Sequence, residues 1–554
     1  MLAAGLNGKW KVSVILQKLH IKLTQLRKLL YMLAIAGYSV SISANANLFN
    51  EQQIVLPFNL TQPVIAANLL TAPGNELLIL GVDETGQRQF AIYALDSSGK
   101  MMLVDQLKLD LSLFAFDVGD IQPDGLQKLY FLSKEQLYQY QFVGPVQDSV
   151  KVSGPIMAAP PSATIPSIKN SHSSLVPIAK ISSMYLSSQA DTITAVDFAK
   201  DINNDKFDDF ILPYFEQLNL YLSGQQTADS GVLSQQTLDI STILRVDDEE
   251  VSFQPRELFF VDMDLNNSTD IVVVESGQLS VFQQTTDGHF NPVSWHIPLA
   301  ADIEGINWWD KIEADGQQLD QSQLKHKKID AITDINGDGL PDLIIRYTQS
   351  SGVLDRTNDY EFFYGKVAND LLSFALSADT KIQSDSTLSD LKWLDLDNDG
   401  KQEIMLSAFD LGISQIISAL LSSSIEQEVL IFKMDDNHHY PAKPSATQDV
   451  EITFSLSSGR SGEPMVKAQD VNGDKLKDLI FSEGDEEIKV LFASSTDKKL
   501  FSKRAEKYKV KVPKNAKSIT HSDVNNDGKM DLILHYSRTD PPELLNKIVV
   551  LIAN

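Results

Sequence analysis

The side chains best suited to chemistry lie in one short loop, at relative positions 1, 3, 5 and 9: Asp334, Asn336, Asp338 and Asp342. Gly339 is at position 6, and short apolar runs flank the loop. Ca²⁺ takes roughly six to eight oxygen ligands, so carboxylate, amide and carbonyl oxygens must converge on one point. Alternate residues of a tightly coiled loop point inward, Gly at position 6 permits the sharp turn, and the acid at position 9 closes the shell. The spacing predicts a calcium loop between two strands.

The same arrangement occurs five more times, and each copy is followed by an apolar run. Each loop is named below by its first residue. The predicted ligands are, in loop 201, Asp201, Asn203, Asp205 and Asp209; in loop 262, Asp262, Asp264, Asn266 and Asp270; in loop 395, Asp395, Asp397, Asp399 and Glu403; in loop 470, Asp470, Asn472, Asp474 and Asp478; and in loop 523, Asp523, Asn525, Asp527 and Asp531. Plain Asp-rich turns are the alternative interpretation. Six copies favour about six structural Ca²⁺ sites.

Two further segments keep part of the pattern. In loop 120 the closing position holds Lys128, whose ammonium takes the place of the carboxylate, so no metal is expected there. In loop 68 only Asn68 and Glu76 keep the interval from position 1 to position 9. We interpret loop 68 as part of a repeat that kept its strands and lost its ion.

Composition sets the class of protein. The 554 residues are 43% hydrophobic and 22% charged, which is typical of a globular chain, and there is no cysteine for disulfides, thiolate metal sites or a catalytic thiol. The formal net charge of −27 argues against nucleic acid or an anionic membrane surface as a partner.

Residues 1–46 resemble an export leader. Basic residues precede an apolar stretch from Leu29 to Ile42, and Ala44-Asn45-Ala46 matches a cleavage signature. The alternative is a membrane anchor that is never removed, but the apolar stretch is short for a span of about 20 residues. We expect export to the periplasm, the cell surface or the medium, and no transmembrane segment in the mature chain. Extracellular calcium sites of about 10⁻⁴–10⁻³ M suit that location.

The rest of the chain, residues 47–554, predicts an all-β fold. Apolar runs such as Leu77–Leu80 and Ile488–Phe492 are separated by Gly, Asn, Asp and Ser turns. The eight loops start at 68, 120, 201, 262, 334, 395, 470 and 523, and each interval has room for four short strands and an insertion. Because one such sheet cannot bury both of its faces alone, the repeats must pack against each other as the blades of a single β-propeller domain.

The motif Asp-x-Asn-Gly-Asp-Gly-x-x-Asp before an apolar strand resembles the FG-GAP and VCBS repeats, the calcium-loop propeller repeats also found in the head of integrin α chains. The turn Thr286–Phe290 after Val281-Phe282 is similar to a second hairpin of the bacterial repeats. The resemblance covers roughly residues 60 to 550. It implies a β-propeller of seven or eight four-stranded blades with calcium loops on its periphery. This sequence departs from the family pattern in two respects: the first two units lack a complete set of ligand residues, and the Phe-Gly…Gly-Ala-Pro signature is not present in clear form.

Three insertions interrupt the repeats. Residues 154–178 are rich in Pro, Ser and Ala and predict an extended surface loop. Residues 411–429 carry apolar side chains at helical spacing and predict a short helix that covers one end of the propeller or docks a partner. Residues 303–328 contain Trp308 and Trp309, for which core or inter-blade packing is favoured over a sugar-binding platform.

Motifs for catalysis are missing: the chain has no His-Glu-x-x-His, no Gly-x-Ser-x-Gly and no Gly-rich phosphate loop, and we assign no catalytic residue. The favoured function is a non-catalytic, calcium-stabilised binding or adhesion scaffold for a protein or glycan. The alternative is a polysaccharide lyase or hydrolase on the same scaffold, which Lys, Arg, His and Tyr converging at the central channel would favour. Fold alone does not choose between them, and the ligand and the oligomeric state stay open.

Overall fold

The computed structural model describes most of the chain after the expected leader. The described residues are 48–142, 173–185, 192–224, 233–246, 251–300, 302–311, 319, 321–352, 355–369, 371–384, 386–409, 424–455, 460–461, 465–494 and 499–554. All the strands belong to one compact unit, Phe49–Ala553, which is described by itself. The expected leader, residues 1–46, lies outside the described residues.

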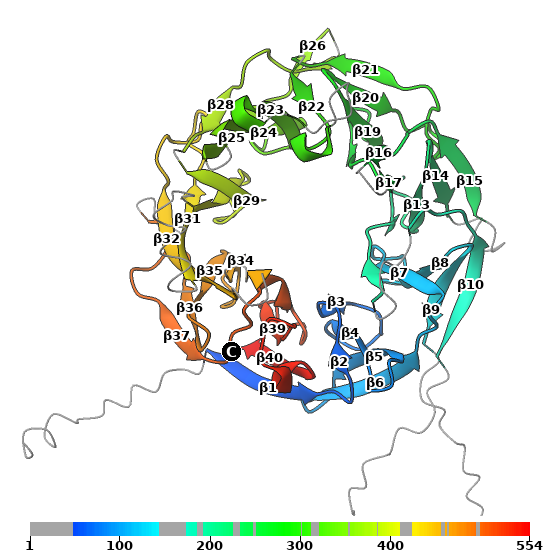
Figure 1. Cartoon of the computed structure of the whole chain (residues 1–554), viewed down its shortest axis with the longest axis vertical. Coiled ribbons are helices and arrows are strands. Elements are labelled where there is room, and N and C mark those ends of the chain that lie inside the picture. Colours follow the sequence, from blue (N-terminus) through cyan, green and yellow to red (C-terminus); the bar gives the residue numbers. More distant parts are fainter. Residues whose placement is uncertain are drawn as a thin grey trace, which may run out of the picture. The chain divides into compact units, whose positions relative to one another are not determined.

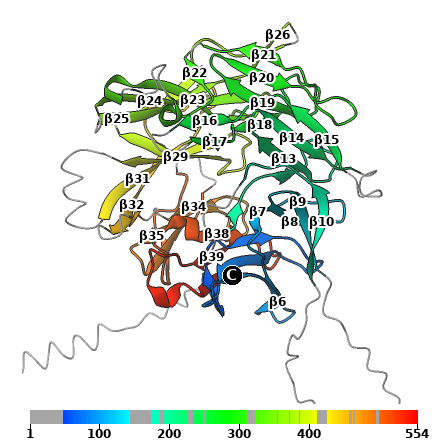
Figure 2. The same cartoon turned by 45° about the vertical axis from the view of Figure 1, so that its right-hand side comes forward.

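The unit consists of mainly antiparallel sheets that follow one another in chain order, and neighbouring sheets lie side by side in both views (Figure 1, Figure 2). In the first half of the chain the strands group as β2 (Asn59–Leu60), β3 (Ile65–Ala67), β4 (Glu76–Val82), β5 (Arg88–Leu95) and β6 (Met101–Lys108); β7 (Leu113–Val118), β8 (Leu129–Ser133), β9 (Gln136–Gln141), β10 (Ser174–Lys180) and β11 (Thr194–Ala195); β12 (Ala199–Lys200), β13 (Asp209–Tyr214), β14 (Gln217–Leu222) and β15 (Ser234–Leu238); and β18 (Leu258–Val261), β19 (Asp270–Glu275), β20 (Gln278–Phe282) and β21 (Trp295–Pro298).

The second half continues in the same way. Its groups are β23 (Lys325–Thr333), β24 (Asp342–Gly352), β25 (Asp355–Phe363) and β28 (Thr380–Ile382); β29 (Thr387–Leu394), β30 (Glu403–Phe409), β31 (Ser424–Phe432) and β32 (Ala446–Ser455); β34 (Val466–Gln469), β35 (Asp478–Glu483), β36 (Glu487–Leu491) and β37 (Glu506–Lys509); and β38 (Ile519–Ser522), β39 (Asp531–His535) and β40 (Lys547–Ala553) with β1 (Phe49–Val55).

Short elements fill the connections. They are the hairpin β16 (Ile243–Val246) and β17 (Val251–Gln254), the hairpin β26 (Lys366–Ala368) and β27 (Leu371–Ser373), the strands β22 (Ile303–Glu304) and β33 (Arg460–Ser461), and the 3₁₀ turns η1 (Trp308–Asp310), η2 (Gln321–Gln323), η3 (Ala516–Ser518) and η4 (Pro542–Leu544).

These groups, six of four strands and two of five, make the fold a β-propeller, which confirms the predicted all-β propeller class. The described strands fall into eight such groups. That division separates β25 from β29, which share one ten-stranded sheet through the single parallel pair Asn358↔Thr387. The number of blades therefore stays a prediction.

Packing between neighbouring groups explains why the second strands read as continuous apolar runs. In β4, Leu77 and Ile79 pack with Ile533 and Val550 of the last group. Leu78 and Leu80, which alternate with them, pack on the other face against residues of β7 and β8 that include Phe116 and Phe131. Each inner strand is thus buried on both faces by two different neighbours, as radial packing requires.

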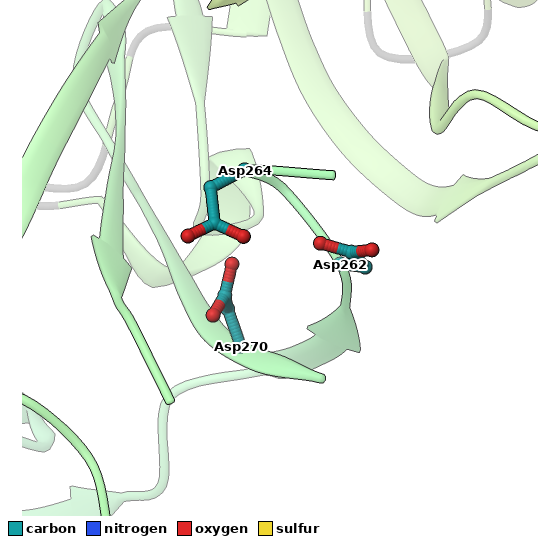
Figure 3. Close-up of side chains that lie close together, drawn as sticks. All are labelled: Asp262, Asp264 and Asp270. Carbon is teal, nitrogen blue, oxygen red and sulfur yellow. The ribbon is translucent and has the colours of Figure 1, made fainter. Parts of the chain in front are cut away.

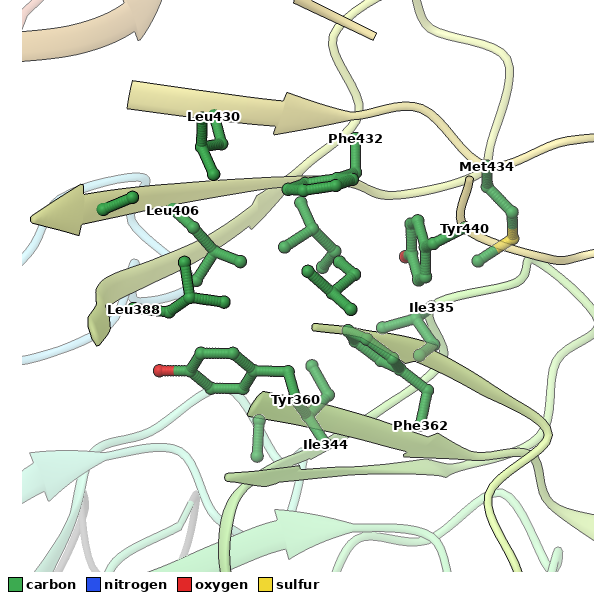
Figure 4. Close-up of a cluster of buried hydrophobic side chains, with 14 of the residues drawn as sticks. Ile335, Ile344, Tyr360, Phe362, Leu388, Leu406, Leu430, Phe432, Met434 and Tyr440 are labelled. Atoms are coloured by element: carbon green, nitrogen blue, oxygen red, sulfur yellow. The ribbon is translucent and has the colours of Figure 1, made fainter. Parts of the chain in front are cut away.

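Figure 4 shows one of these interfaces, between β24–β25 and β29–β31. Ile344, Tyr360 and Phe362 face Leu406 and Phe432 across it, and all five side chains are at most 2% exposed. Such large buried side chains account for much of the stability of the fold, since burying each contributes about 1.5–3 kcal/mol.

The first and the last described strands pair with each other and so connect the first part of the unit to the last. β1 pairs antiparallel with β40 over seven residues, from Phe49↔Ala553 to Val55↔Lys547, and so forms the outer strand of the last group. Phe49 is fully buried and Ile54 nearly so.

The insertions differ in part from expectation. Residues 174–178 of the predicted loop 154–178 lie in β10, paired with β9, because apolar residues such as Leu175 and Ile178 pack on the neighbouring cores. Residues 154–172 lie outside the described residues. The helix predicted over 411–429 is wrong for 424–429, which belong to β31, while 411–423 lie outside the described residues. The helical spacing of the earlier residues does not extend into this strand.

Candidate metal-binding loops

The six predicted loops occupy one equivalent place in the fold. Each joins the first strand of its group to the second: β12 to β13, β18 to β19, β23 to β24, β29 to β30, β34 to β35 and β38 to β39. All six therefore lie at the same end of the strands. The outermost strands of the groups in Figure 1 are fourth strands such as β10, β15 and β37. The implied placement of the loops on the periphery is thus wrong, because they connect inner strands.

Each loop holds two residues in the left-handed backbone region, at positions 4 and 6. Position 6 is Gly in three loops, with φ of 84° at Gly339, and Lys or Asn in the others, with φ of 72° at Lys206. Position 4 is Asn or Gly except in loop 262, where Leu265 has φ of 61°. The ligand spacing predicted a sharp turn at position 6 but did not predict the left-handed conformation at position 4. The recurring Asn and Gly at position 4 were the sequence signal for it.

The carboxylate at position 1 fixes the coil of the loop. In loop 395, Asp395 accepts hydrogen bonds from the backbone N–H of Asp399 at 3.1 Å and of Gly400 at 3.0 Å. The carboxylate at position 5 accepts from the N–H two residues later, as Asp399 does from Lys401 at 2.9 Å. The same bonds recur at both positions in loop 523. The side chains at positions 1 and 5 are therefore held by the backbone of their own loop.

The acid at position 9 is the first residue of the second strand and is fully buried in all six loops. In loop 334 one oxygen of Asp342 accepts from the N–H of Ile335, at position 2, at 3.0 Å. The other oxygen accepts from the N–H of Gly365, just beyond the third strand, at 2.9 Å. This residue thus ties the loop to the rest of its sheet.

Burial of these closing acids raises their pKa, and the neighbouring carboxylates of the loop raise it further. The pKa is raised to about 6 for Asp270, Asp478 and Asp531, to about 7 for Asp342 and Glu403, and to about 8 for Asp209. Backbone hydrogen bonds oppose the shift without cancelling it. An ionised acid at these positions therefore lacks enough positive charge around it, which a bound cation supplies.

Loop 395 has carboxylate oxygens that lack a hydrogen-bond donor. Glu403 is fully buried, yet its Oε1 has no hydrogen-bond partner, and neither does Oδ1 of Asp397. One oxygen each of Asp395, Asp397 and Glu403 lies within 4.8 Å of the others. A buried carboxylate oxygen without a donor is costly unless something positive meets it. An all-oxygen set of this kind suits Ca²⁺.

Loop 262 brings its acids together in the same way. Figure 3 shows Asp262, Asp264 and Asp270 converging, and one oxygen of each lies within 4.8 Å of the others. Asp270 comes from the start of β19, whereas the other two lie in the coil before it.

The two incomplete loops differ from the six in their partners. In loop 120, Lys128 Nζ lies 2.6 Å from Asp124 Oδ2 at position 5, so the ammonium pairs with a residue of the ligand pattern. In loop 68, Glu76 keeps the bond of a closing acid to position 2, where it accepts from the N–H of Leu69 at 2.7 Å, and it also accepts from the N–H of Leu70 at 3.1 Å. The closing acid therefore has a role in the fold that does not depend on the other ligands.

Neighbouring loops are also joined to each other. The backbone N–H at position 8 of one loop donates to the carbonyl at position 1 or 2 of the preceding loop at five junctions: Gln402 to Ile335 at 3.1 Å, Lys477 to Leu396 at 3.0 Å, Met530 to Asp470 at 2.8 Å, Asn75 to Asp523 at 3.3 Å and Gln127 to Asn68 at 2.7 Å. The link from Asn75 connects the first repeat to the last. Position 8 of loop 334 is Pro341, which has no N–H for such a link.

Side chains replace this link between loops 120 and 201. The carboxylate of Asp208, at position 8, accepts from the N–H of Asp120 at 2.7 Å and from the Tyr130 hydroxyl at 2.8 Å. Asp120 Oδ2 in turn accepts from the N–H of Asp201 at 2.8 Å. Asp120 therefore links two loops of the structure.

The two Trp of η1 do not pack as favoured from sequence. Trp309 is 45% exposed, and neither Trp belongs to the apolar clusters of the described residues. Their rings are 5.3 Å apart at 86°, so they form a corner and not a flat platform. The guanidinium of Arg356 lies 4.4 Å from the Trp308 ring, and that of Arg346 lies 5.9 Å from the Trp309 ring. Cations on the strands β24 and β25 hold this turn, which spacing alone did not reveal.

Comparison with known proteins adds the following. No protein-family model and no curated protein matches the chain. Similar solved structures include an Agrocybe aegerita lectin that recognises non-reducing terminal N-acetylglucosamine (10% identity, 85% of this chain and 82% of that chain, TM-score 0.33), the WD40 domain of SCAP from fission yeast (11%, 91% and 98%, 0.35) and the V. cholerae biofilm matrix protein Bap1 (10%, 91% and 92%, 0.29). Similarity at this level carries no argument about ligand or activity.

The described part of the chain contains no helix with the length and apolar character needed to span a membrane.

Proposed function

We propose that this protein is an exported, calcium-binding β-propeller of the FG-GAP and VCBS type that works as a non-catalytic scaffold for a protein or glycan ligand. Ca²⁺ in about six loops stabilises the junctions between inner strands. The observation that carries the calcium part is the buried closing acid, best seen in Glu403, whose Oε1 meets no donor beside two further carboxylates. The polysaccharide-acting enzyme stays a prediction that no described feature favours.

Charge supports the proposal. The expected leader has six basic and no acidic residues, so the exported chain would be more acidic than the −27 of the whole sequence. Many of these carboxylates are crowded into the loops, where they repel each other without an ion. Bound Ca²⁺ removes that repulsion and adds stability in proportion to the logarithm of its concentration above its Kd.

Thermal unfolding with and without excess chelator tests the calcium part, together with elemental analysis of the purified protein. We expect calcium at about one ion per complete loop and a lower melting temperature after chelation. A protein that contains no calcium and melts at the same temperature in both conditions would contradict the proposal.

Asp338→Asn tests one loop with little change of shape. Asp338 Oδ1 accepts a hydrogen bond from the N–H of Leu340 at 2.9 Å, and an amide oxygen can accept the same bond. The variant removes a charge from the ligand set, so we expect a lower melting temperature in calcium and little change in chelator. An equal drop in both conditions would mean that Asp338 stabilises the loop without an ion.

A further inference from the structure

In two groups, the residue directly after the third strand donates a hydrogen bond to the predicted ligand at position 3. In loop 262, Gln283 Nε2 donates to Asp264 Oδ2. In loop 395, Lys433 Nζ donates to Asp397 Oδ2 and lies 3.3 Å from Asp399 Oδ2. Both donors directly follow the last residue of their strand, Phe282 in β20 and Phe432 in β31.

Strand register identifies the equivalent residue in the other four groups. The residue at position 10 of each loop pairs with a third-strand residue, as Ile271 does with Phe282 and Ile404 with Phe432. The residue after that partner is aliphatic or aromatic in the remaining loops: Leu222, Tyr364, Phe492 and Ile552.

The identity of this residue follows the identity of the ligand at position 3. The four loops with an aliphatic or aromatic residue have Asn at position 3, whereas the two loops with Gln283 or Lys433 have Asp. An Asn amide can donate within its own loop, as Asn472 Nδ2 does to Asp474 Oδ2 at 3.1 Å. An Asp in that place has no proton to donate. Oδ2 of Asp397 accepts from outside its loop, from Lys433, whereas Oδ2 of Asp264 accepts from Gln283 and also, within its own loop, from Asn266 Nδ2 at 3.0 Å.

The formal charge of the predicted ligands also distinguishes loop 395, which contains Lys433 in its surroundings. Five of the loops contain three carboxylates among their four predicted ligands, and loop 395 contains four. With the Lys433 ammonium added, the formal charge summed over the four predicted ligands of loop 395 is −3, the same as the sum over the four predicted ligands of each other loop.

The ammonium does not replace the ion in loop 395. In loop 120 a lysine stands at position 9 itself, whereas loop 395 keeps Glu403 there. Oε1 of Glu403 and Oδ1 of Asp397 still lack a donor although Lys433 is in place. Lys433 thus satisfies the outer oxygen of Asp397 and leaves the inner one for a cation.

We propose that Gln283 and Lys433 are positioning residues that orient an acidic calcium ligand at position 3, and that Lys433 sets the divalent-cation affinity of loop 395. The inference rests on the calcium function proposed above. Groups that hold a metal ligand from outside commonly change metal affinity when they are removed. The ammonium adds a second effect, since its charge opposes the charge of a bound Ca²⁺.

The effect of the Lys433 charge is tested with Lys433→Gln. This variant removes the positive charge but keeps a hydrogen-bond donor, an amide like the one that Gln283 supplies to loop 262. We expect one calcium site to bind roughly tenfold more tightly, because one unit charge within several ångströms of the ion is lost. Gln283→Lys should weaken one site by a similar factor. Lys381→Gln is the matched control, since Lys381 pairs with Glu361 outside every loop and loses the same charge.

The positioning part is tested with Lys433→Met, which has neither the charge nor the donor. We expect it to bind calcium more weakly than Lys433→Gln. Affinities are measured by titration against a chelator of known affinity at fixed ionic strength, and unfolding in excess chelator shows that each variant is folded.

The outcomes separate the two proposals. If the unaltered protein takes up no calcium, the calcium function itself fails. If it binds calcium but Lys433→Gln binds no more tightly than Lys381→Gln, Lys433 does not set the affinity of loop 395. If Lys433→Met and Lys433→Gln bind equally well, the donor does not position Asp397.

Discussion

The closing acid at position 9 has two roles in each loop. It accepts backbone hydrogen bonds that tie the loop to its sheet, as Asp531 does from Val524 at 2.9 Å and from Ala553 at 2.8 Å. It also points a carboxylate at the proposed ion. Glu76 keeps only the first role, in a loop that has lost the other ligands. The buried acid therefore has a structural role besides the proposed metal binding.

The raised pKa values of these acids predict a pH dependence that calcium should suppress. Without metal, the folded state binds more protons than the unfolded state, whose Asp pKa is about 4, so this contribution to stability is present at low pH. It is lost as the pH rises through the folded pKa values, from about 6 for Asp270 to about 8 for Asp209. We expect the urea midpoint in chelator to fall between pH 5 and pH 8.

Saturating calcium should make this fall much smaller, because the ion favours the ionised carboxylates. Urea denaturation at several pH values, with calcium and with chelator at equal ionic strength, measures the difference. Equal slopes in the two conditions would show that the closing acids do not face a bound ion.

Among the elements, the loops act as connectors between neighbouring sheets. The position 8 links join a donor in one loop to a carbonyl in the loop before it, and Leu396, whose carbonyl accepts from Lys477, is buried. A structural change in one loop therefore acts on the neighbouring loop through this hydrogen bond. Pro341 shows that the chain itself accommodates a junction without this bond.

Lys477→Pro tests the link, with Lys477→Ala as the control that keeps the N–H. We expect the Pro variant to be less stable than the Ala variant by about 1–2 kcal/mol, since the Leu396 carbonyl loses its donor. Calcium stoichiometry should stay the same because no ligand is altered. Urea denaturation in excess calcium measures the difference, and equal stability of the two variants would mean that the link contributes nothing.

The position and coil of the loops could be predicted from sequence because the four candidate ligands of each loop lie within nine residues. The donors Gln283 and Lys433 could not, because strand pairing brings them to the loop from a distant part of the chain. The helix predicted over 411–429 was wrong for residues 424–429 for the same reason, since pairing of β31 with β30 and β32 decides their conformation. Short-range patterns describe single loops and strands, and they do not describe partners.

For the whole molecule, closure depends on β1. Phe49 is fully buried and its ring meets that of Tyr508 edge to face at 5.4 Å. We expect Phe49→Ala to cost about 3–5 kcal/mol of unfolding free energy. Val55→Ala, at the far end of the same strand and 60% exposed, should change it by less than about 0.5 kcal/mol. Urea denaturation of both variants checks this, and similar losses for both would mean that β1 does not anchor the fold through Phe49.

Pairing of β1 with β40 also sets an order of events during synthesis. β1 is the first and β40 the last of the described strands in chain order, so β1 has no partner until β40 has left the ribosome. Contacts between such distant residues form slowly. A growing chain can therefore build its middle sheets first and remains open at its ends, and a product that terminates before Lys547 leaves both β1 and β39 with unpaired edges.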